Sequence, residues 1–345
     1  MRKSLIAASA AAVAVAATGT AVWASAGGGH RSSALPAADS VNAAATPRTP
    51  TKVMSQGFAD PGALKVGRTY YAYGTRGAVR HMPVASAPSA RGPWKLNGTD
   101  GLPKLGAWAN PAKPVWAPDV SRRPDGSYLL YYTAWSNRYR HMCVGAATAK
   151  SPAGPFKPVG TGPLECVAPK AARHKGLAPG EIIDPSAFTV GRDHYLLYKV
   201  GYNGAKPWKP SFLVIQKMTA DGTRKSGAAR VILTETSEPY TVEAPYMVKH
   251  GSAYVLFYSA GFYGNDTYQT RWATASRPTG PFKKGGVLMS TASLGKKVRG
   301  PGGATVMNDG GTWRLFFHGA ITLKPLSRTL YTAELGWSGN RPHVR

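Results

Sequence analysis

The sequence is poor in cysteine and in acidic residues. Its 345 residues include two cysteines and 16 Asp and Glu, against 43 Lys and Arg. Two cysteines alone, Cys143 and Cys166, argue against a cysteine-rich metal centre and against a scaffold held by several disulfides. Long amphipathic helical patterns are also missing, which argues against a helical fold. Because acids are scarce, an acidic side chain that recurs at one place in a repeated pattern becomes a candidate functional residue.

The first 52 residues differ in composition from the rest of the chain. Residues 1–26 carry Arg2 and Lys3, an Ala-rich apolar run and the small residues Ala-Ser-Ala at 24–26, as in a secretory signal peptide. The run is short for a membrane span, so we expect cleavage and no membrane association afterwards. Residues 27–52 read as a disordered linker rich in Ala, Ser, Thr and Pro. The folded domain is predicted over 53–345, in a secreted, extracellular protein.

The expected export and the net charge indicate the state of the cysteines and the partners that the protein could have. In an oxidising compartment Cys143 and Cys166 are expected to form one local disulfide. The formal net charge of +27 favours non-specific attraction to acidic polymers. The basic residues are dispersed instead of gathered on one face, so nucleic acid is not the expected partner. We expect a monomer that acts on a polysaccharide or oligosaccharide, for the reasons that follow.

Five segments of the chain share one pattern. They read "DPGALKVGRTYYAYGT" from Asp60, "PDVSRRPDGSYLLYYTA" from Pro118, "DPSAFTVGRDHYLLYKV" from Asp184, "APYMVKHGSAYVLFYSA" from Ala244 and "GGATVMNDGGTWRLFFHGA" from Gly302. Each has a short strand, a turn with Gly and a second strand rich in Tyr, Leu and Phe. The turns "ARGPW", "PAGPF" and "PTGPF" close three of the units. A period near 60 residues with about four strands predicts an all-β, five-bladed β-propeller with a central channel.

Four acidic residues lie at or near the same point of the repeat, just before or at its first strand. They are Asp60, Asp119, Asp184 and Glu243. An Asp before Pro can simply start a turn, but the inner strands of a propeller converge on the channel, so we expect these carboxylates to meet at one mouth. Glycoside hydrolysis needs such a group: one carboxyl protonated to donate a proton, another ionised to activate water. A third carboxylate raises the pKa of the acid by like-charge repulsion.

Aromatic side chains adjoin these acids. Phe58, Trp116 and Tyr246 offer faces against which sugar rings could stack, although each could equally belong to the core. The sequence therefore predicts a carbohydrate site that combines the acids with these three rings.

The ordered set "FADPG", "WAPDV", "IIDPSAF" and "VEAPYM" resembles glycoside hydrolase family 43, the five-bladed propeller arabinanases, arabinofuranosidases and xylosidases. The resemblance extends to "CVGAATAKSPAGPF" and "RTLYTAELGW". It implies an inverting hydrolase with Asp60 as general base, Glu243 as general acid and Asp184 as the carboxylate that tunes and orients the acid. It places Asp119 in a sugar-binding subsite. The substrate it favours is the α-L-arabinofuranosidic bond of plant cell-wall polysaccharides, and the chemistry requires no cofactor.

Two further residues follow from the resemblance. His318 in "LFFHGA" matches a histidine that reaches toward a channel ion, often calcium, in arabinan-active relatives; a buried structural His is the alternative. Arg299 is a candidate for hydrogen bonds to sugar hydroxyls.

Other functions stay open at this point. A β-xylosidase or another furanosidase of the same family would share the three acids, and a non-catalytic carbohydrate-binding propeller would share the fold. Retaining fructan-cleaving propellers are disfavoured because their first motif reads Asn-Asp-Pro-Asn, where this chain has Ala59-Asp60-Pro61-Gly62.

Overall fold

The computed structural model describes residues 49–75, 80–167, 180–201, 209–235 and 241–345. The predicted signal peptide and most of the predicted linker lie outside these residues. The described residues form strands, and no helix among them could cross a membrane.

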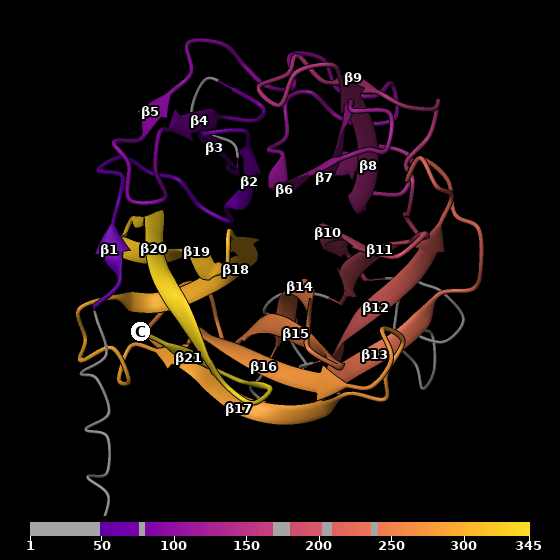
Figure 1. The fold of residues 1–345 in the computed structure, drawn as a ribbon. Coiled ribbons are helices and arrows are strands. Elements are labelled where there is room, and N and C mark those ends of the chain that lie inside the picture. The colour runs from indigo at the N-terminus through magenta and orange to yellow at the C-terminus, as the bar shows by residue number, and fades with distance from the viewer. Residues whose placement is uncertain (1–48, 76–79, 168–179, 202–208, 236–240) are drawn as a thin grey trace, which may run out of the picture. The chain divides into compact units, whose positions relative to one another are not determined.

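The strands form five sheets around a central channel, with β2, β6, β10, β14 and β18 innermost (Figure 1). Blade 1 comprises β2 (Gly62–Val66), β3 (Thr69–Tyr73), β4 (Val84–Ala87) and β5 (Lys95–Leu96). Blade 2 comprises β6 (Trp116–Arg122), β7 (Tyr128–Ser136), β8 (His141–Ala149) and β9 (Lys157–Pro158). Blade 3 comprises β10 (Ile182–Val190), β11 (Asp193–Val200), β12 (Ser211–Met218) and β13 (Arg230–Glu235).

Blade 4 comprises β14 (Val242–His250), β15 (Ala253–Ala260), β16 (Gln269–Ala275) and β17 (Lys283–Ser290). Blade 5 comprises β18 (Arg299–Asp309), β19 (Thr312–Leu323) and β20 (Leu326–Ser338), with β1 (Thr51–Lys52) and β21 (Arg341–Val344) both paired to β20. The inner strands contact one another in sequence order, and β18 contacts β2, which closes the ring. The predicted five-bladed β-propeller is confirmed.

Burial on both faces explains why the second strands are almost continuously apolar. Leu130 and Tyr132 of β7 face blade 1 and pack with its Tyr73 and Val84, whereas Leu129 and Tyr131 belong to the core shared with blade 3. Successive side chains of a strand point to opposite faces, so a strand between two neighbouring blades must be apolar on both. The Tyr-, Leu- and Phe-rich half of each repeat meets this requirement.

The domain boundary needs a correction. Thr51 and Lys52, assigned above to the linker, form β1 and pair with Thr332 and Tyr331 of blade 5. The folded domain therefore begins before Val53.

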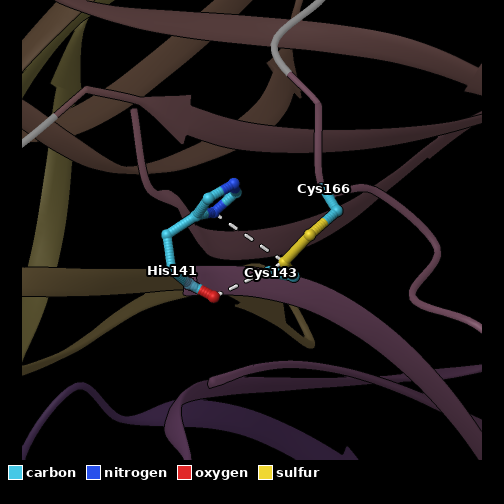
Figure 2. Close-up of side chains that lie close together, drawn as sticks. All are labelled: His141, Cys143 and Cys166. Carbon is cyan, nitrogen blue, oxygen red and sulfur yellow. Dashed lines mark hydrogen bonds between the residues drawn. A yellow bond between two sulfur atoms is a disulfide. The ribbon is translucent and has the colours of Figure 1, made fainter. Parts of the chain in front are cut away.

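A disulfide joins Cys143 of β8 to Cys166 in the segment after β9, with 4.6 Å between their Cα atoms (Figure 2). Both residues are buried, and the bridge lies beside His141. Among the described residues, these three are the one group spaced closely enough to suggest a metal site, but both sulfurs are already bonded to each other. The link thus fastens the segment after β9 to its own blade.

The double variant Cys143→Ser/Cys166→Ser should unfold more easily. The bridge spans 23 positions, and the chain-entropy estimate for a loop of this length is a loss of about 3 kcal/mol in the free energy of unfolding. Urea denaturation of the oxidised protein and the variant measures the difference. An unchanged midpoint would show that the bridge adds nothing to stability.

Candidate active site

Each blade has a residue in the left-handed backbone region at an equivalent point, where its inner strand begins or bends. These residues are Asp60, Ala117, Asp184, Ala244 and Gly303, with φ of 49°, 43°, 55°, 49° and 62°. Four of them are not glycine, and for these residues the conformation costs free energy and persists only where the surroundings enforce it. In blades 2 to 5 the pairing of the inner strand shifts register at this point. The repeat thus places one left-handed residue per blade at the channel mouth, and in blades 1 to 4 this residue is strained because it is not glycine.

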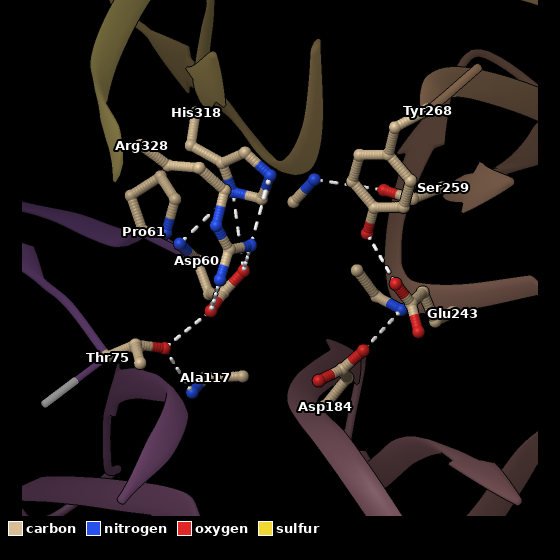
Figure 3. A network of polar contacts seen from close by, with 12 residues as sticks. Asp60, Pro61, Thr75, Ala117, Asp184, Glu243, Ser259, Tyr268, His318 and Arg328 are labelled. Carbon is tan, nitrogen blue, oxygen red and sulfur yellow. Dashed lines mark hydrogen bonds and ion pairs between the residues drawn. The ribbon is translucent and has the colours of Figure 1, made fainter. Parts of the chain in front are cut away.

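The backbone N–H of each left-handed residue donates a hydrogen bond to a side chain of the preceding blade. Together these bonds form a closed ring, which we call the inter-blade ring. Figure 3 shows the contacts that Asp60, Ala117, Asp184 and Ser259 make in it. The pairs are Asp60 to His318 Nδ1 (3.1 Å), Ala117 to Thr75 Oγ1 (3.1 Å), Asp184 to Thr133 Oγ1 (3.2 Å), Ala244 to Asp184 Oδ2 (2.9 Å) and Gly303 to Ser259 Oγ (2.9 Å).

The inter-blade ring corrects the expected alignment of the four acids. Asp60 and Asp184 are the left-handed residues of their blades and are equivalent. Glu243 comes one residue before its left-handed neighbour Ala244, and Asp119 comes two residues after Ala117. The four acids therefore occupy three different positions of the repeat.

Asp60, Asp184 and Glu243 nevertheless line one pocket, of about 370 Å³. Its walls come from blades 1 to 5 and combine acids, aromatic rings and one arginine: Asp60, Thr75, Trp116, Glu181, Ile183, Asp184, Glu243, Tyr263, Tyr268 and Arg328. A concave site with converging carboxylates and aromatic rings suits a sugar bound in the presence of acid and base groups.

Asp60 is held as a carboxylate. Its Oδ1 and Oδ2 accept hydrogen bonds from the two terminal nitrogens of Arg328, at 2.7 and 3.3 Å, and Oδ2 also accepts one from Thr75 at 2.5 Å. Burial alone would raise the pKa of Asp60, but the Arg328 charge and the Thr75 hydroxyl more than offset it, so the pKa lies below its ordinary value.

Asp184 is in the opposite electrostatic situation. Burial, followed by repulsion from Glu243 and Asp60, raises the pKa of Asp184 to about 8. Its Oδ2 accepts the Ala244 N–H, so this carboxyl holds the backbone next to Glu243. Glu243 itself is buried; Oε1 accepts a hydrogen bond from the Tyr268 hydroxyl at 2.7 Å, and Oε2 accepts one from Lys199 at 2.8 Å.

His318 does not fit a calcium site. The ring is fully buried; Nδ1 accepts the Asp60 N–H, and Nε2 lies 3.3 Å from the guanidinium of Arg328. Burial and the Arg328 charge lower the pKa of His318 to about 3, so the ring is neutral. A guanidinium at this distance repels a second cation. The surroundings of His318 therefore do not fit a directly bound calcium ion, and in this structure the ring serves as the acceptor that joins blade 5 to blade 1.

The sequence profile of glycosyl hydrolases family 43 matches residues 50–341. The chain belongs to this family. A probable arabinan endo-1,5-α-L-arabinosidase B of Aspergillus fumigatus is 27% identical over 313 residues, covering 78% of this chain and 80% of the relative. As a member of this family, the chain is a glycoside hydrolase.

Solved family-43 structures share the fold. A thermostable family-43 glycoside hydrolase superposes with a TM-score of 0.72 and 24% identity, covering 86% of this chain and 95% of that one. The Cellvibrio cellulosa α-L-arabinanase complexed with arabinohexaose superposes with a TM-score of 0.67 and 21% identity, covering 84% and 96%. The likeness therefore extends over almost the whole of each solved chain.

Two predicted sugar contacts of this family-43 enzyme are wrong. Phe58 is 1% exposed and packs in the core with Tyr70 and Phe316, so its ring cannot reach a ligand. Arg299 is exposed and forms a two-pronged ion pair with Asp266, at 2.9 and 2.5 Å, instead of lining the pocket.

Two further predicted contacts lie in the central channel. Asp119 and Tyr246 line a narrow space of about 40 Å³ that shares Asp60 and Asp184 with the pocket but does not include its aromatic rings. Asp119 Oδ2 accepts the Ala187 N–H at 2.8 Å, tying β6 to β10, and burial raises the pKa of Asp119 to about 7. Asp119 joins two blades and Tyr246 lies in the narrow channel space outside the pocket, so their assignment to a sugar subsite is corrected. Trp116 is half-buried and does line the pocket.

Sequence reasoning missed several residues of the pocket. Glu181, Tyr263, Tyr268 and Arg328 contribute side chains to it from loops or from a third strand, where the repeat has no common motif. Lys199 had a visible signal, since it is a charge inside the apolar run "HYLLYKV".

Replacing Arg328 by Met should raise the pKa of Asp60, because the cation that lowers it is removed. The acidic limb of the kcat/KM profile for hydrolysis should then move to higher pH, since that limb reports an essential base in the free enzyme. Arg328→Lys keeps the charge and is the matched control, with a smaller shift. An acidic limb that stays in place in Arg328→Met would separate Asp60 from the titration that controls activity.

Proposed function

We propose that this enzyme hydrolyses α-L-arabinofuranosidic bonds of arabinan with inversion of configuration. In this proposal Asp60 removes a proton from a water molecule, which attacks the anomeric carbon. Glu243 donates its proton to the glycosidic oxygen as the bond to the leaving sugar breaks. Asp184 orients Glu243 through the Ala244 N–H and, as a neighbouring carboxylate, keeps a proton on the pair.

One observation carries the catalytic part of the proposal. Carboxyl groups from blades 1, 3 and 4 line one pocket, and their surroundings drive their pKa values apart: Asp60 below its ordinary value and Asp184 to about 8. Near pH 7 the pocket therefore offers an ionised carboxylate opposite a pair that retains a proton. An acid and a base acting on opposite sides of one bond need this difference.

The substrate in this proposal is inferred from what the relatives are named for. The Aspergillus fumigatus relative is named an arabinan endo-1,5-α-L-arabinosidase, and the Cellvibrio cellulosa structure contains arabinohexaose. Trp116 and Tyr263 supply the aromatic faces that sugar rings require. We further propose that the protein is exported, on the strength of residues 1–26, and so meets extracellular polysaccharide.

Release of sugars from linear arabinan, with xylan and an aryl β-xyloside in parallel, tests the substrate. We expect products from arabinan and at most slow turnover of the xylosides. NMR of the first product should show the inverted anomer. Faster turnover of the xyloside would overturn the substrate, and a retained anomer would overturn the mechanism.

Glu243→Gln should lose activity in proportion to how much the leaving group needs a proton. We expect loss of roughly 10²-fold or more on arabino-oligosaccharides and a much smaller loss on an aryl arabinofuranoside with an activated phenol. Asp60→Asn removes water activation and should reduce both rates similarly. Equal losses on the two substrates for Glu243→Gln would contradict its assignment as the acid. A sugar-binding module without catalysis would show no turnover by the wild-type protein at all.

A further inference from the structure

Lys199 breaks the regularity of the inter-blade ring. In blades 2 to 5, the second strand pairs with the inner strand. We consider the second-strand residue that lies opposite the position just before the left-handed residue. These partners are Thr133, Lys199, Ser259 and His318, and Thr75 follows the corresponding strand of blade 1. Four of the five accept the N–H of the next blade's left-handed residue. The residue in blade 3 is a lysine.

A lysine cannot take the acceptor's place. Its ammonium has three donors and no lone pair, so it cannot receive the Ala244 N–H. That hydrogen bond goes instead to Asp184 Oδ2, at 2.9 Å. Lys199 points to Glu243, with 2.8 Å between Nζ and Oε2 and side chains that are 0% and 5% exposed. One departure from the repeat thus accounts for two features: the contact of Asp184 with the backbone beside Glu243 and a buried ion pair at Glu243.

Such an ion pair acts strongly on its carboxyl group. Two buried charges attract each other far more than exposed ones, and a buried carboxylate that loses its partner is costly. The ammonium favours the ionised form of Glu243, whereas the nearby carboxylates favour the protonated form. Among the described residues, the charged or titratable groups that interact with Glu243 are Lys199, Tyr268, Asp184, Glu181 and Arg328. His141 interacts electrostatically with Glu181.

We propose that Lys199 is the positioning residue of Glu243: it fixes the carboxyl group in the pocket and sets the pH at which this acid loses its proton. The inference rests on the proposed function, because it takes Glu243 as the acid. Lys199 and Asp184 then act on the same proton in opposite directions. Lys199 favours its departure, and Asp184 favours its retention.

Lys199→Thr is the decisive variant, because Thr133 shows that the fold accepts threonine at this position of the repeat. Removing the ammonium should keep Glu243 protonated to higher pH, so the alkaline limb of the kcat/KM profile should rise by about one pH unit or more. Asp184→Asn should move the same limb to lower pH, since a carboxylate is removed. In Lys199→Thr, the carboxyl group of Glu243 also loses its orientation. This loss should lower kcat on arabino-oligosaccharides about tenfold or more, and less on an activated aryl arabinofuranoside.

Two controls separate charge from packing. Lys199→Arg keeps the cation and should leave the alkaline limb within a few tenths of a unit of the wild type. Lys199→Met keeps the side-chain length without charge and should shift the limb as Lys199→Thr does. A stability cycle with Glu243→Gln is a second test that needs no activity: the loss in melting temperature caused by Lys199→Met should be smaller in the Glu243→Gln background, and Lys199→Thr takes its place in the cycle if Lys199→Met does not fold.

An unchanged alkaline limb in both neutral variants, with activity reduced equally at every pH, would overturn the proposal and leave Lys199 a packing residue. In the stability cycle, equal losses in the two backgrounds would do the same. Failure of the proposed function has a different signature. In that event Glu243→Gln in the otherwise wild-type enzyme would show no dependence on the leaving group, whatever the Lys199 variants do.

Discussion

The backbone hydrogen bond between successive blades is the constraint on which the active site depends. Each blade offers one N–H from a left-handed residue, and each preceding blade must supply an acceptor. A left-handed non-glycine residue persists only where its surroundings hold it, so these bonds fix the backbone as well as the spacing of the blades. Side chains at the left-handed position, or next to it, are thereby presented to the channel mouth. Asp60 and Asp184 occupy that position, and Glu243 adjoins it.

The two sides of the pocket are built with opposite charge balance. On the side of blades 1 and 5, Arg328 pairs with Asp60, and His318 stays neutral because it is buried beside that guanidinium. On the side of blades 3 and 4, three carboxyl groups of the described residues, those of Glu181, Asp184 and Glu243, all interact with the ammonium of Lys199. Asp60 therefore favours the ionised form on the side of blades 1 and 5, whereas the carboxyl groups on the side of blades 3 and 4 favour the retention of a proton. Because the chain has only 16 Asp and Glu, the presence of four of them in one pocket indicates a functional site.

The sequence sufficed for the fold and for the three central acids, because both are expressed in the repeat. Gly-bearing turns and apolar second strands recur at a nearly constant period, and Asp-Pro marks two of the bends. The sequence could not show that Phe58 belongs to the core, since an aromatic residue beside a motif looks the same in the sequence whether its ring faces a sugar or the core. It placed Asp119 with the other acids although its carboxyl lies two residues further along the strand. Tyr268 reaches the pocket through loop geometry, which no local pattern encodes. Arg328 opens the segment "RTLYTAELGW", but only the pairing of the strands shows that its side chain meets Asp60.

The outer edge of β20 is shared by two segments from opposite ends of the domain. Strand β1 pairs with Tyr331 and Thr332, and β21 pairs with residues Leu335 to Ser338. During synthesis β1 therefore waits without a partner until almost the whole domain has been made. Closing so long a loop is slow, although its entropic cost grows only gradually with length. The acceptor His318 lies in the same late blade, and the N–H of Asp60 depends on it. The catalytic pocket should accordingly be among the last parts of the molecule to become ordered, and a nascent chain would carry no active enzyme before the final blade closes.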